Sequence, residues 1–496
     1  MGEPRLNTLL IVCIPVIAVI ALVAPLTCTL YEGESPWAVV VVMNCSKRVY
    51  GGYLGQDDFY FCGYVYFGGR EYTPRPFVAK YSVADGGLEW FKTFEDIKGW
   101  SYSVLVAGGR VVVTGLWSRG GFITCLDSSG NLLWGYLTPK QLYGLTALGD
   151  AILAYGNGQL ILLRLDGEVL RSASLEIKNA LGEWSSANIC YAVYVDGKIY
   201  AVGYGTNIVS TRRGLGSFDG YLICLDESLK VLWAVGFGNE NISEYPRYLD
   251  VVDDSLYMCG FNQVYEEGRV VSEDIALLEF RADGTPIGGE AIRIGGHGYS
   301  VALRIRGGSI YLVGSVSGYG AGSSDFAVIE LQKGAGNATL WTIGGGEEEW
   351  CSGAVFTEGG ILMYGLTRTW INKGGKHPSP MIVYWPLGYV GEVKWNKSDW
   401  ESIKVKSYKD LKASPYRFIA SPLSVRLRTS YFKAWAPNTK EHMFKVIRSI
   451  PSIAVTEPKG GGLGTAPSPF SISAVLAAAA LATLITVYLV VRRCRR

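Results

Sequence analysis

The amino-acid sequence predicts an all-β protein whose main part is a seven-bladed β-propeller of four-stranded blades, with an N-terminal signal or anchor segment and a C-terminal transmembrane helix. Three observations lead to this fold class. A unit of four short strand-like runs recurs along the chain. The chain contains 63 glycines, 31 tyrosines and 14 tryptophans, a composition typical of strands joined by tight turns. An apolar run over 470–491 is followed directly by "RRCRR" at 492–496.

The N-terminal segment, residues 1–30, is apolar, and we interpret it as a signal peptide or an N-terminal membrane anchor. Residues 9–26 carry no charge and follow Arg5, which is typical of both kinds of segment. Ala24 is followed by Pro25, so the sequence leaves open whether this segment is cleaved.

The region 37–395 is expected to form the propeller, and residues 299–343 show one complete repeat. This copy divides into strands over 300–305, 309–315, 325–331 and 338–343, separated by glycine-rich turns. The phrases "GFITCLDSSGNLLWGYL", from 121, and "DGYLICLDESLKVLWAVGF", from 219, are expected to be the third and fourth strands of two such copies. One four-stranded sheet cannot bury both of its faces, whereas sheets stacked around a ring bury them against one another.

One glycine ends the second strand of every copy and therefore counts the blades. These marker glycines recur at intervals of roughly 40 to 57 residues, which is typical of a four-stranded propeller blade. The marker glycines are Gly63, Gly115, Gly156, Gly203, Gly260, Gly314 and Gly365. The run "WAVVVV" at 37–42 precedes the first copy. We expect it to pair with the last blade near 381–385 and to close the ring.

The strongest local motif combines a Leu-Asp turn with a tryptophan and follows a glycine-ended hairpin. It is carried by Leu126-Asp127-Ser128-Ser129-Gly130 with Trp134, by Leu225-Asp226 with Trp233, and by Gly197-Lys198-Ile199-Tyr200 with Gly203. This pattern resembles the SBBP-like β-propeller repeats of prokaryotic cell surfaces and, more loosely, the PQQ-like repeats of quinoproteins. The resemblance covers roughly 37–395 and implies an extracytoplasmic propeller that binds, scaffolds or catalyses. A PQQ enzyme would add Glu, Asn, Asp and Arg residues around the channel. We place no such set here and expect no cofactor.

The C-terminal part of the chain is expected to tether the propeller to a membrane. Residues 396–456 do not repeat and are interpreted as a small membrane-proximal β module, and 457–469 as a Pro/Gly linker. The run 470–491 is long enough for a transmembrane helix. The arginines in 492–496 mark the cytoplasmic side, so we expect a cell-membrane protein, single-pass or two-pass, with the propeller outside the cytoplasm.

Four N-x-S/T sequons agree with an external propeller and are candidate glycosylation sites. Their asparagines are Asn44, Asn241, Asn337 and Asn396.

Several kinds of chemistry are disfavoured by the composition. The three histidines, His297, His377 and His442, are far apart in sequence, so neither a histidine-built metal site nor a Ser-His-Asp relay is expected. The formal net charge of +2 gives no general attraction to nucleic acid, and no nucleic-acid partner is expected. Cys224 and Cys259 could be close to each other, but buried free thiols are the favoured interpretation.

An aromatic residue stands just before the innermost strand of most blades, and these residues are the candidate ligand-binding set. Their side chains are Tyr50, Trp100, Tyr143, Tyr245, Tyr299 and Trp350. Four of them precede the marker glycine by 15 residues, whereas Tyr50 and Tyr143 precede it by 13, which we interpret as a shorter hairpin. Asn188 holds the 15-residue position in the copy that ends at Gly203. The rings would surround one channel mouth, or they would act only as wedges between blades.

Three functions remain open at the level of sequence. The leading one is a binding or scaffolding module for a surface glycan, a peptide or a partner protein, with the membrane as a second partner. The second is an extracytoplasmic enzyme, either a quinoprotein-like oxidoreductase or a glycan-acting hydrolase with paired carboxylates. The third is a structural component of the cell envelope.

Overall fold

A computed structural model of the chain describes most of the propeller and several strands that follow it. The described residues are 37–41, 46–66, 73–82, 87–211, 218–294, 296–320, 322–333, 337–368, 378–387, 404–415, 419–422, 425–429, 433–434, 439–441 and 446–449.

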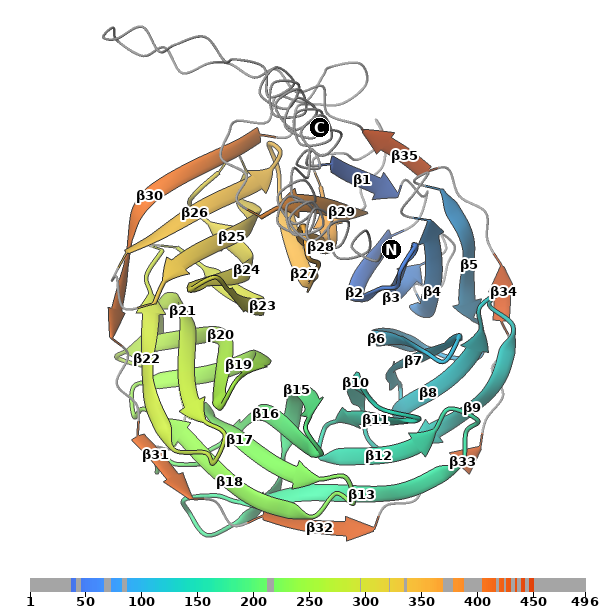
Figure 1. The fold of residues 1–496 in the computed structure, drawn as a ribbon, viewed down its shortest axis with the longest axis horizontal. Helices are drawn as coiled ribbons and strands as arrows, with labels where there is room; N and C mark the ends of the chain where they lie inside the picture. Colours follow the sequence, from blue (N-terminus) through green and yellow to red (C-terminus); the bar gives the residue numbers. More distant parts are fainter. Residues whose placement is uncertain are drawn as a thin grey trace, which may run out of the picture. The chain divides into compact units, whose positions relative to one another are not determined.

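Seven antiparallel blades form a closed ring, which confirms the predicted seven-bladed propeller (Figure 1). Blade 1 contains β2 (Ser46–Leu54), β3 (Asp58–Tyr66), β4 (Arg75–Ser82) and β5 (Leu88–Phe94). Blade 2 contains β6 (Gly99–Ala107), β7 (Arg110–Trp117), β8 (Gly120–Asp127) and β9 (Leu132–Thr138). Blade 3 contains β10 (Leu142–Leu148), β11 (Ala151–Gly156), β12 (Gln159–Arg164), β13 (Val169–Lys178) and the short β14 (Trp184–Ser186).

The other four blades follow in sequence order around the ring. Blade 4 contains β15 (Asn188–Val195), β16 (Lys198–Thr206), β17 (Phe218–Asp226) and β18 (Val231–Gly238). Blade 5 contains β19 (Ile242–Val252), β20 (Ser255–Glu266), β21 (Arg269–Arg281) and β22 (Pro286–Ile292). Blade 6 contains β23 (Gly298–Arg306), β24 (Ser309–Ser317), β25 (Ser324–Gln332) and β26 (Asn337–Gly344). Blade 7 contains β27 (Glu349–Phe356), β28 (Gly360–Thr367), β29 (Ser379–Pro386) and the N-terminal β1 (Trp37–Val41).

The two similar phrases are the third and fourth strands of blades 2 and 4, as the sequence predicts. β8 and β17 are buried along almost their whole length, because neighbouring blades cover both of their faces. The fourth strands β9 and β18 alternate between buried and more exposed positions, because they lie near the outer edge.

The hydrophobic core is divided into seven clusters, one between each pair of adjacent blades. The cluster between blades 1 and 7, for example, joins Phe61 and Phe77 to Tyr364 and Ile382. Burial of apolar surface between sheets therefore holds the ring together, as the repeat pattern requires.

The N-terminal strand closes the ring, as expected. β1 pairs antiparallel with β29, with Trp37 opposite Tyr384 and Val40 opposite Met381. Blade 7 thus takes strands from both ends of the repeat region, and the edge of β29 is covered.

The strands beyond residue 403 form a belt around the outside of the ring (Figure 1). We define the belt as β30 (Lys404–Pro415), β31 (Ile419–Pro422), β32 (Val425–Thr429), β33 (Lys433–Ala434), β34 (Thr439–Glu441) and β35 (Val446–Ser449). β30 pairs with β26 and β22, and so joins blades 6 and 5 in one sheet. The next strands pair with β18, β13, β9, β5 and β1 in turn. Every blade therefore receives an additional outer strand from the belt.

The belt differs from the separate membrane-proximal module that the sequence predicted over 396–456. Its described strands are too short to bury a core of their own, and each pairs with a blade instead. The described strands of this segment use backbone edges that the repeats leave open, and the module over 396–456 stays a prediction for the residues outside them.

The tryptophan and the turn of the repeat motif join neighbouring blades. Trp90 Nε1 donates a hydrogen bond of 3.1 Å to the Ser128 carbonyl of blade 2, and Trp134 Nε1 donates one of 2.9 Å to Leu165 of blade 3. A Cβ atom at Gly167, where φ is +98°, would lie 2.9 Å from the Trp134 ring. The glycine of each such turn therefore makes room for the tryptophan of the preceding blade.

The expected membrane segments lie outside the described part of the chain, at 1–30 and 470–491, as do the linker 457–469 and the tail 492–496. Within the described residues, no helix has the length and apolar character needed to span a bilayer.

Candidate ligand-binding site

The innermost strand of every blade contains a β-bulge at the same position. In β2, for example, Val49 pairs with Gly63 and Gly51 pairs with Cys62, so Tyr50 between them has no cross-strand partner. Such a bulge bends the strand and redirects the side chain of its extra residue. The seven bulge residues are Tyr50, Tyr102, Tyr143, Cys190, Arg247, Val301 and Ser352.

The marker glycines are explained by the backbone just before each bulge. A Cβ atom at Gly63 would overlap the carbonyl oxygen of Arg48, and one at Gly314 would overlap that of Tyr299. The same close approach occurs at all seven marker glycines. The glycines therefore recur because a side chain at this position would collide with the main chain of the inner strand.

The shorter hairpin that the sequence suggested for Tyr50 and Tyr143 does not occur. Every marker glycine pairs with the residue fourteen positions earlier, such as Val49 for Gly63 and Leu142 for Gly156. The position fifteen residues before the glycine belongs to Arg48 in blade 1 and Gln141 in blade 3. Tyr50 and Tyr143 are bulge residues, so the predicted set of six falls on two structural positions.

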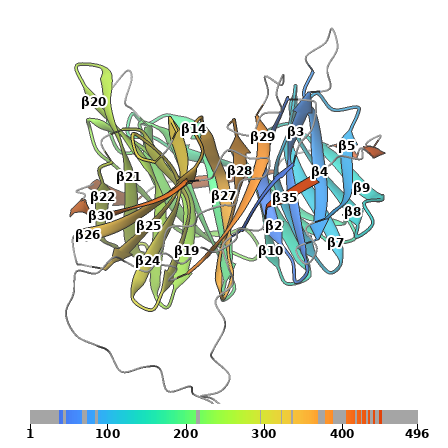
Figure 2. The same ribbon diagram turned by 90° about the horizontal axis from the view of Figure 1, so that it is seen from above.

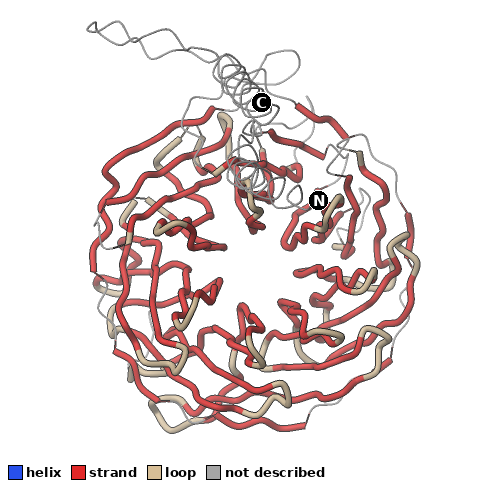
Figure 3. The backbone as a smooth tube through the Cα atoms, viewed as in Figure 1, coloured by secondary structure: helices blue, strands red, loops and turns tan. Residues whose placement is uncertain are grey.

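A cavity of about 1340 Å³ lies at the centre of the propeller and is lined by the bulge residue of all seven blades. The inner strands converge around this centre (Figure 3). Of the predicted aromatic set, Tyr50, Tyr143, Tyr299 and Trp350 line the cavity. Trp100 and Tyr245 are not among the lining residues. Trp350 is the most open of the six, with 41% of its surface exposed.

The aromatic side chains in and beside the central cavity form two arcs. The first aromatic arc, from blades 1 to 3, contains Tyr50, Tyr64, Trp100, Tyr102 and Tyr143. The second aromatic arc, from blades 4 to 7, contains Tyr204, Tyr245, Phe261, Tyr299 and Trp350. Ring centroids of successive members lie 4.7–6.5 Å apart, within the range of favourable aromatic contacts.

Each predicted aromatic residue also touches a ring of a neighbouring blade. Tyr50 lies 5.1 Å from Tyr102 of blade 2, and Tyr299 lies 5.7 Å from Trp350 of blade 7. Trp100 lies 5.7 Å from Tyr64 of blade 1. The binding and wedge interpretations therefore coexist for the cavity-lining members, whereas Trp100 and Tyr245 have the geometry of wedges.

The hydroxyl groups of the arcs remain protonated at neutral pH. Burial raises the pKa of Tyr64, Tyr143 and Tyr245 to about 12 each, and it also raises the pKa of Tyr50. A protonated phenol presents an apolar face together with an O–H donor.

Arg247 is the only charged bulge residue. Its guanidinium carbon lies 5.6 Å from the centroid of Phe261 and 5.9 Å from that of Tyr204. Arg247 is exposed, lines the cavity and forms no ion pair with a carboxylate of the described residues. Arg48 also lines the cavity and interacts electrostatically with Tyr50, Tyr64 and Glu348.

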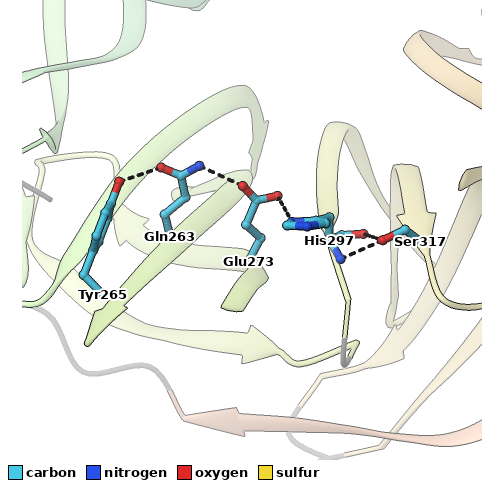
Figure 4. A network of polar contacts seen from close by, with 5 residues as sticks. All are labelled: Gln263, Tyr265, Glu273, His297 and Ser317. Atoms are coloured by element: carbon cyan, nitrogen blue, oxygen red, sulfur yellow. Dashed lines mark hydrogen bonds and ion pairs between the residues drawn. The ribbon is translucent and has the colours of Figure 1, made fainter. Parts of the chain in front are cut away.

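A polar chain runs from blade 5, which also carries Arg247, to blade 6 and includes His297 (Figure 4). Tyr265 donates to Gln263 at 2.9 Å, and Gln263 donates to Glu273 at 2.7 Å. Glu273 contacts His297 Nδ1 at 3.0 Å, and the backbone N–H of His297 donates to Ser317 Oγ at 2.8 Å. Gln263 and Glu273 belong to the long hairpin of β20 and β21, which extends beyond its neighbours in the side view (Figure 2).

Among the described lining residues, the cavity has two carboxylates, and each has a basic partner. Glu273 faces His297, and Glu348 lies 3.0 Å from Arg368 and accepts a hydrogen bond from Trp350. The described residues contain no cluster of three or more His, Cys, Asp or Glu side chains that could hold a metal ion. This arrangement suits recognition by stacking and hydrogen bonding.

Other predicted positions are only partly described. Asn241 is exposed at the turn before β19, and Asn337 begins β26, whereas Asn44 and Asn396 lie outside the described residues. The described cysteines, which include Cys224 and Cys259, are free thiols.

Sequence reasoning missed the bulge residues Tyr102, Cys190, Arg247, Val301 and Ser352. The spacing contained the signal, since each precedes its marker glycine by 13 residues. A search for aromatic residues alone concealed the 13-residue spacing, because the bulge position also carries cysteine, arginine, valine and serine.

Solved structures similar to this chain are β-propellers, although the likeness is limited to the fold. The WD40 domain of Neurospora crassa Pan2 is 11% identical with a TM-score of 0.43, covering 69% of this chain and 90% of that one. BamB from Moraxella catarrhalis is 14% identical with a TM-score of 0.40, covering 68% and 85%. The polysaccharide lyase Uly1 is 10% identical with a TM-score of 0.45, covering 72% and 99%.

No protein-family model and no curated protein matches the sequence. Fold and site together define a seven-bladed β-propeller with an aromatic central cavity. The resemblance to SBBP-like or PQQ-like repeats stays a prediction, apart from the propeller fold that it implies.

Proposed function

We propose that this chain is a cell-surface binding module whose ligand occupies the central cavity. The observation that carries the proposal is that one residue from each of the seven blades, placed by a bulge, lines a single cavity of about 1340 Å³. Ligand sites are concave, largely apolar and supplied with a few oriented polar groups. The two aromatic arcs supply the apolar faces, and Arg247 and the Gln263–Glu273–His297 chain supply the polar groups.

The binding function is favoured over hydrolysis by the state of the cavity carboxylates. A glycan-acting hydrolase needs a carboxylic acid and a carboxylate facing each other across the bond that breaks. Glu273 and Glu348 are instead held by His297 and Arg368.

The proposal places the propeller outside the cytoplasm, anchored by the helix expected over 470–491. Its support is the length of this apolar run and the arginines that follow it at 492–496. A partner at the cell surface, either a glycan or a protein, fits this placement.

The test is a glycan and peptide array probed with the full-length chain in lipid nanodiscs. We expect binding that is lost when Tyr143 and Trp350 are replaced together by alanine, with a melting temperature that stays well above the assay temperature in a matched thermal scan. Binding that survives this double substitution would show that the ligand does not use the cavity. The Trp184→Ala variant is the control, because Trp184 is an exposed aromatic residue that does not line the cavity.

A further inference from the structure

We infer that the ligand is an acidic carbohydrate whose carboxylate binds to Arg247 at the centre of the propeller. This inference rests on the proposed binding function and specifies the chemical class of the ligand. Arg247 differs from the other six bulge residues, which are three tyrosines, a cysteine, a valine and a serine. A repeated structural position thus carries one cation at a point where all seven blades meet a common cavity.

The surroundings of Arg247 hold its guanidinium without neutralising it. Tyr204 and Phe261 flank the guanidinium at 5.9 and 5.6 Å, a geometry that attracts a cation to the ring faces. Stacking of this kind orients the planar group while leaving its N–H donors available for a carboxylate. No carboxylate of the described residues lies within ion-pair distance of Arg247.

The remaining charges of the cavity do not compensate for Arg247. Arg304 pairs with Asp250 at 3.7 Å and Glu348 with Arg368 at 3.0 Å, so these charges are balanced locally. Arg48 adds a second lining cation, whereas Glu273 is the one further lining carboxylate and faces His297. Positive charge therefore exceeds negative charge around the cavity whether or not His297 is protonated. A low-dielectric cavity with one excess sign of charge favours a ligand of the opposite sign.

The cavity walls of blades 1, 2, 3 and 7 favour a carbohydrate as the carrier of that carboxylate. Tyr50, Tyr102 and Tyr143 of the first aromatic arc line the cavity, and so does Trp350 of the second. Such faces stack on the C–H faces of sugar rings. Hydroxyl groups of a sugar need both donors and acceptors, which the Gln263 amide provides together with the lining hydroxyl Ser317.

The experiment compares pairs of ligands that differ only in charge. Oligogalacturonate and other uronic-acid oligosaccharides are arrayed beside their methyl esters, which keep the ring and the linkage but lose the carboxylate charge. Aspartate-rich peptides form a third group of probes. The full-length chain in nanodiscs is tested as wild type, Arg247→Gln and Arg119→Gln. Arg119 is an exposed arginine between β7 and β8 that does not line the cavity, so its variant is a matched loss of charge.

We expect the wild type to bind at least one uronic acid more tightly than its ester, and to bind it more weakly as ionic strength rises. Arg247→Gln should weaken binding of the acid by about tenfold or more, because a hydrogen bond to a charged group is lost, and should leave binding of the ester unchanged. Arg119→Gln should bind as the wild type does.

Four outcomes would overturn the inference. Equal affinity for acids and esters, or an Arg247→Gln variant with full affinity for the acid, would show that no carboxylate is bound at Arg247, while the proposed binding function would stand. Binding to the aspartate-rich peptides alone would replace carbohydrate by protein as the ligand class. Failure to bind any probe would refute the acidic carbohydrate, and the proposed function would then depend on its own double substitution at Tyr143 and Trp350.

Discussion

Side chains at one repeated position line the central cavity of this ring, one from each blade. Each bulge places one residue per blade against the cavity, so substitutions at that position change the cavity surface without changing the repeat. Tyr50 and Arg247 occupy the same structural position, although one is neutral and aromatic and the other is a cation. The fold can therefore present seven independently variable side chains to one ligand.

Trp350 and Trp100 provide a matched pair for separating binding from packing. Trp350→Ala should weaken ligand binding by roughly 2- to 10-fold, because a stacking contact contributes about 0.5–1.5 kcal/mol, and should change the melting temperature little. Trp100→Ala should instead cost roughly 3 kcal/mol of unfolding free energy, because it removes a wedge between blades 1 and 2. Thermal melts and binding isotherms of both variants are the measurement. The reverse pattern would make Trp100 the ligand contact.

The close backbone approach at the marker glycines predicts that a side chain at these positions destabilises the fold. Gly314→Ala should destabilise the protein by roughly 1–3 kcal/mol or more, because its Cβ atom would overlap the Tyr299 carbonyl. Gly288→Ala is the control, since a Cβ atom there meets no atom within 4 Å. Denaturant unfolding of both variants tests this, and equal stabilities would refute the steric explanation.

Some strands of this fold could be predicted from the sequence, whereas the belt and the bulges could not. The strands of blade 6 lie within two residues of their expected bounds, because apolar runs and glycine turns are local signals. The belt was missed because all its strands except β30 are short, two of its strands end in Pro415 and Pro422, and pairing through backbone groups leaves no apolar pattern. The bulges were missed because a register shift depends on the partner strand and not on residue type.

The Leu-Asp turns make stability depend on pH. Asp127 Oδ1 accepts hydrogen bonds from the backbone N–H groups of Asn131 and Ser129, at 2.8 and 2.9 Å, and Asp226 does the same for Lys230 and Ser228. The Asn131 bond lowers the pKa of the Asp127 carboxyl group, and a hydrogen bond of 2.7 Å from the Ser228 hydroxyl, followed by the backbone bonds, lowers that of Asp226 in the folded protein. Their contribution to stability is therefore complete above about pH 4 and is lost as the pH falls through the folded-state pKa.

Replacing both aspartates tests this pH dependence. Acid unfolding of the Asp127→Asn, Asp226→Asn double variant should show a shallower loss of stability below about pH 4 than that of the wild type. Asp57→Asn serves as the control, because Asp57 is an exposed turn residue outside these hydrogen-bond sets. A double variant with the acid-unfolding curve of the wild type would mean that the turns do not carry this linkage.

The molecule as a whole combines a propeller with an encircling belt. Seven outer edges, those of β1, β5, β9, β13, β18, β22 and β26, are each paired with a belt strand. Lysine and arginine are frequent along 404–449, and proline occurs twice in the belt strands. Both features discourage the new outermost edge from pairing with a second molecule.

Removal of the belt should therefore cause self-association. A chain ending at residue 395 should melt at a lower temperature and form oligomers, because the outer edges of its blades are unpaired. A chain ending at residue 456 keeps the belt and is the control. Size-exclusion chromatography with light scattering and a thermal scan measure both effects. A monomeric short chain with an unchanged melting temperature would show that the belt is not needed.

The proposed membrane topology is testable on the whole protein in cells. With the arginines of 492–496 inside, external protease should digest the propeller and leave a small protected C-terminal fragment. An epitope tag placed after Arg496 identifies that fragment, and permeabilised cells are the control. A propeller that is protected in intact cells would reverse the topology.

The direction of the belt has a consequence for how the chain is assembled. Synthesis delivers the blades in the order 1 to 7, whereas the belt meets blade 6 first, then blades 5, 4, 3, 2 and 1, and finally blade 7. Its last strand, β35, pairs with β1, the first strand of the chain. In a ring that lacked one blade, one belt strand would have no blade edge to pair with. The later belt strands would then no longer lie beside the outer strands of their own blades. All the belt strands can therefore pair in register only with a ring that contains all seven blades, so belt pairing depends on a complete ring.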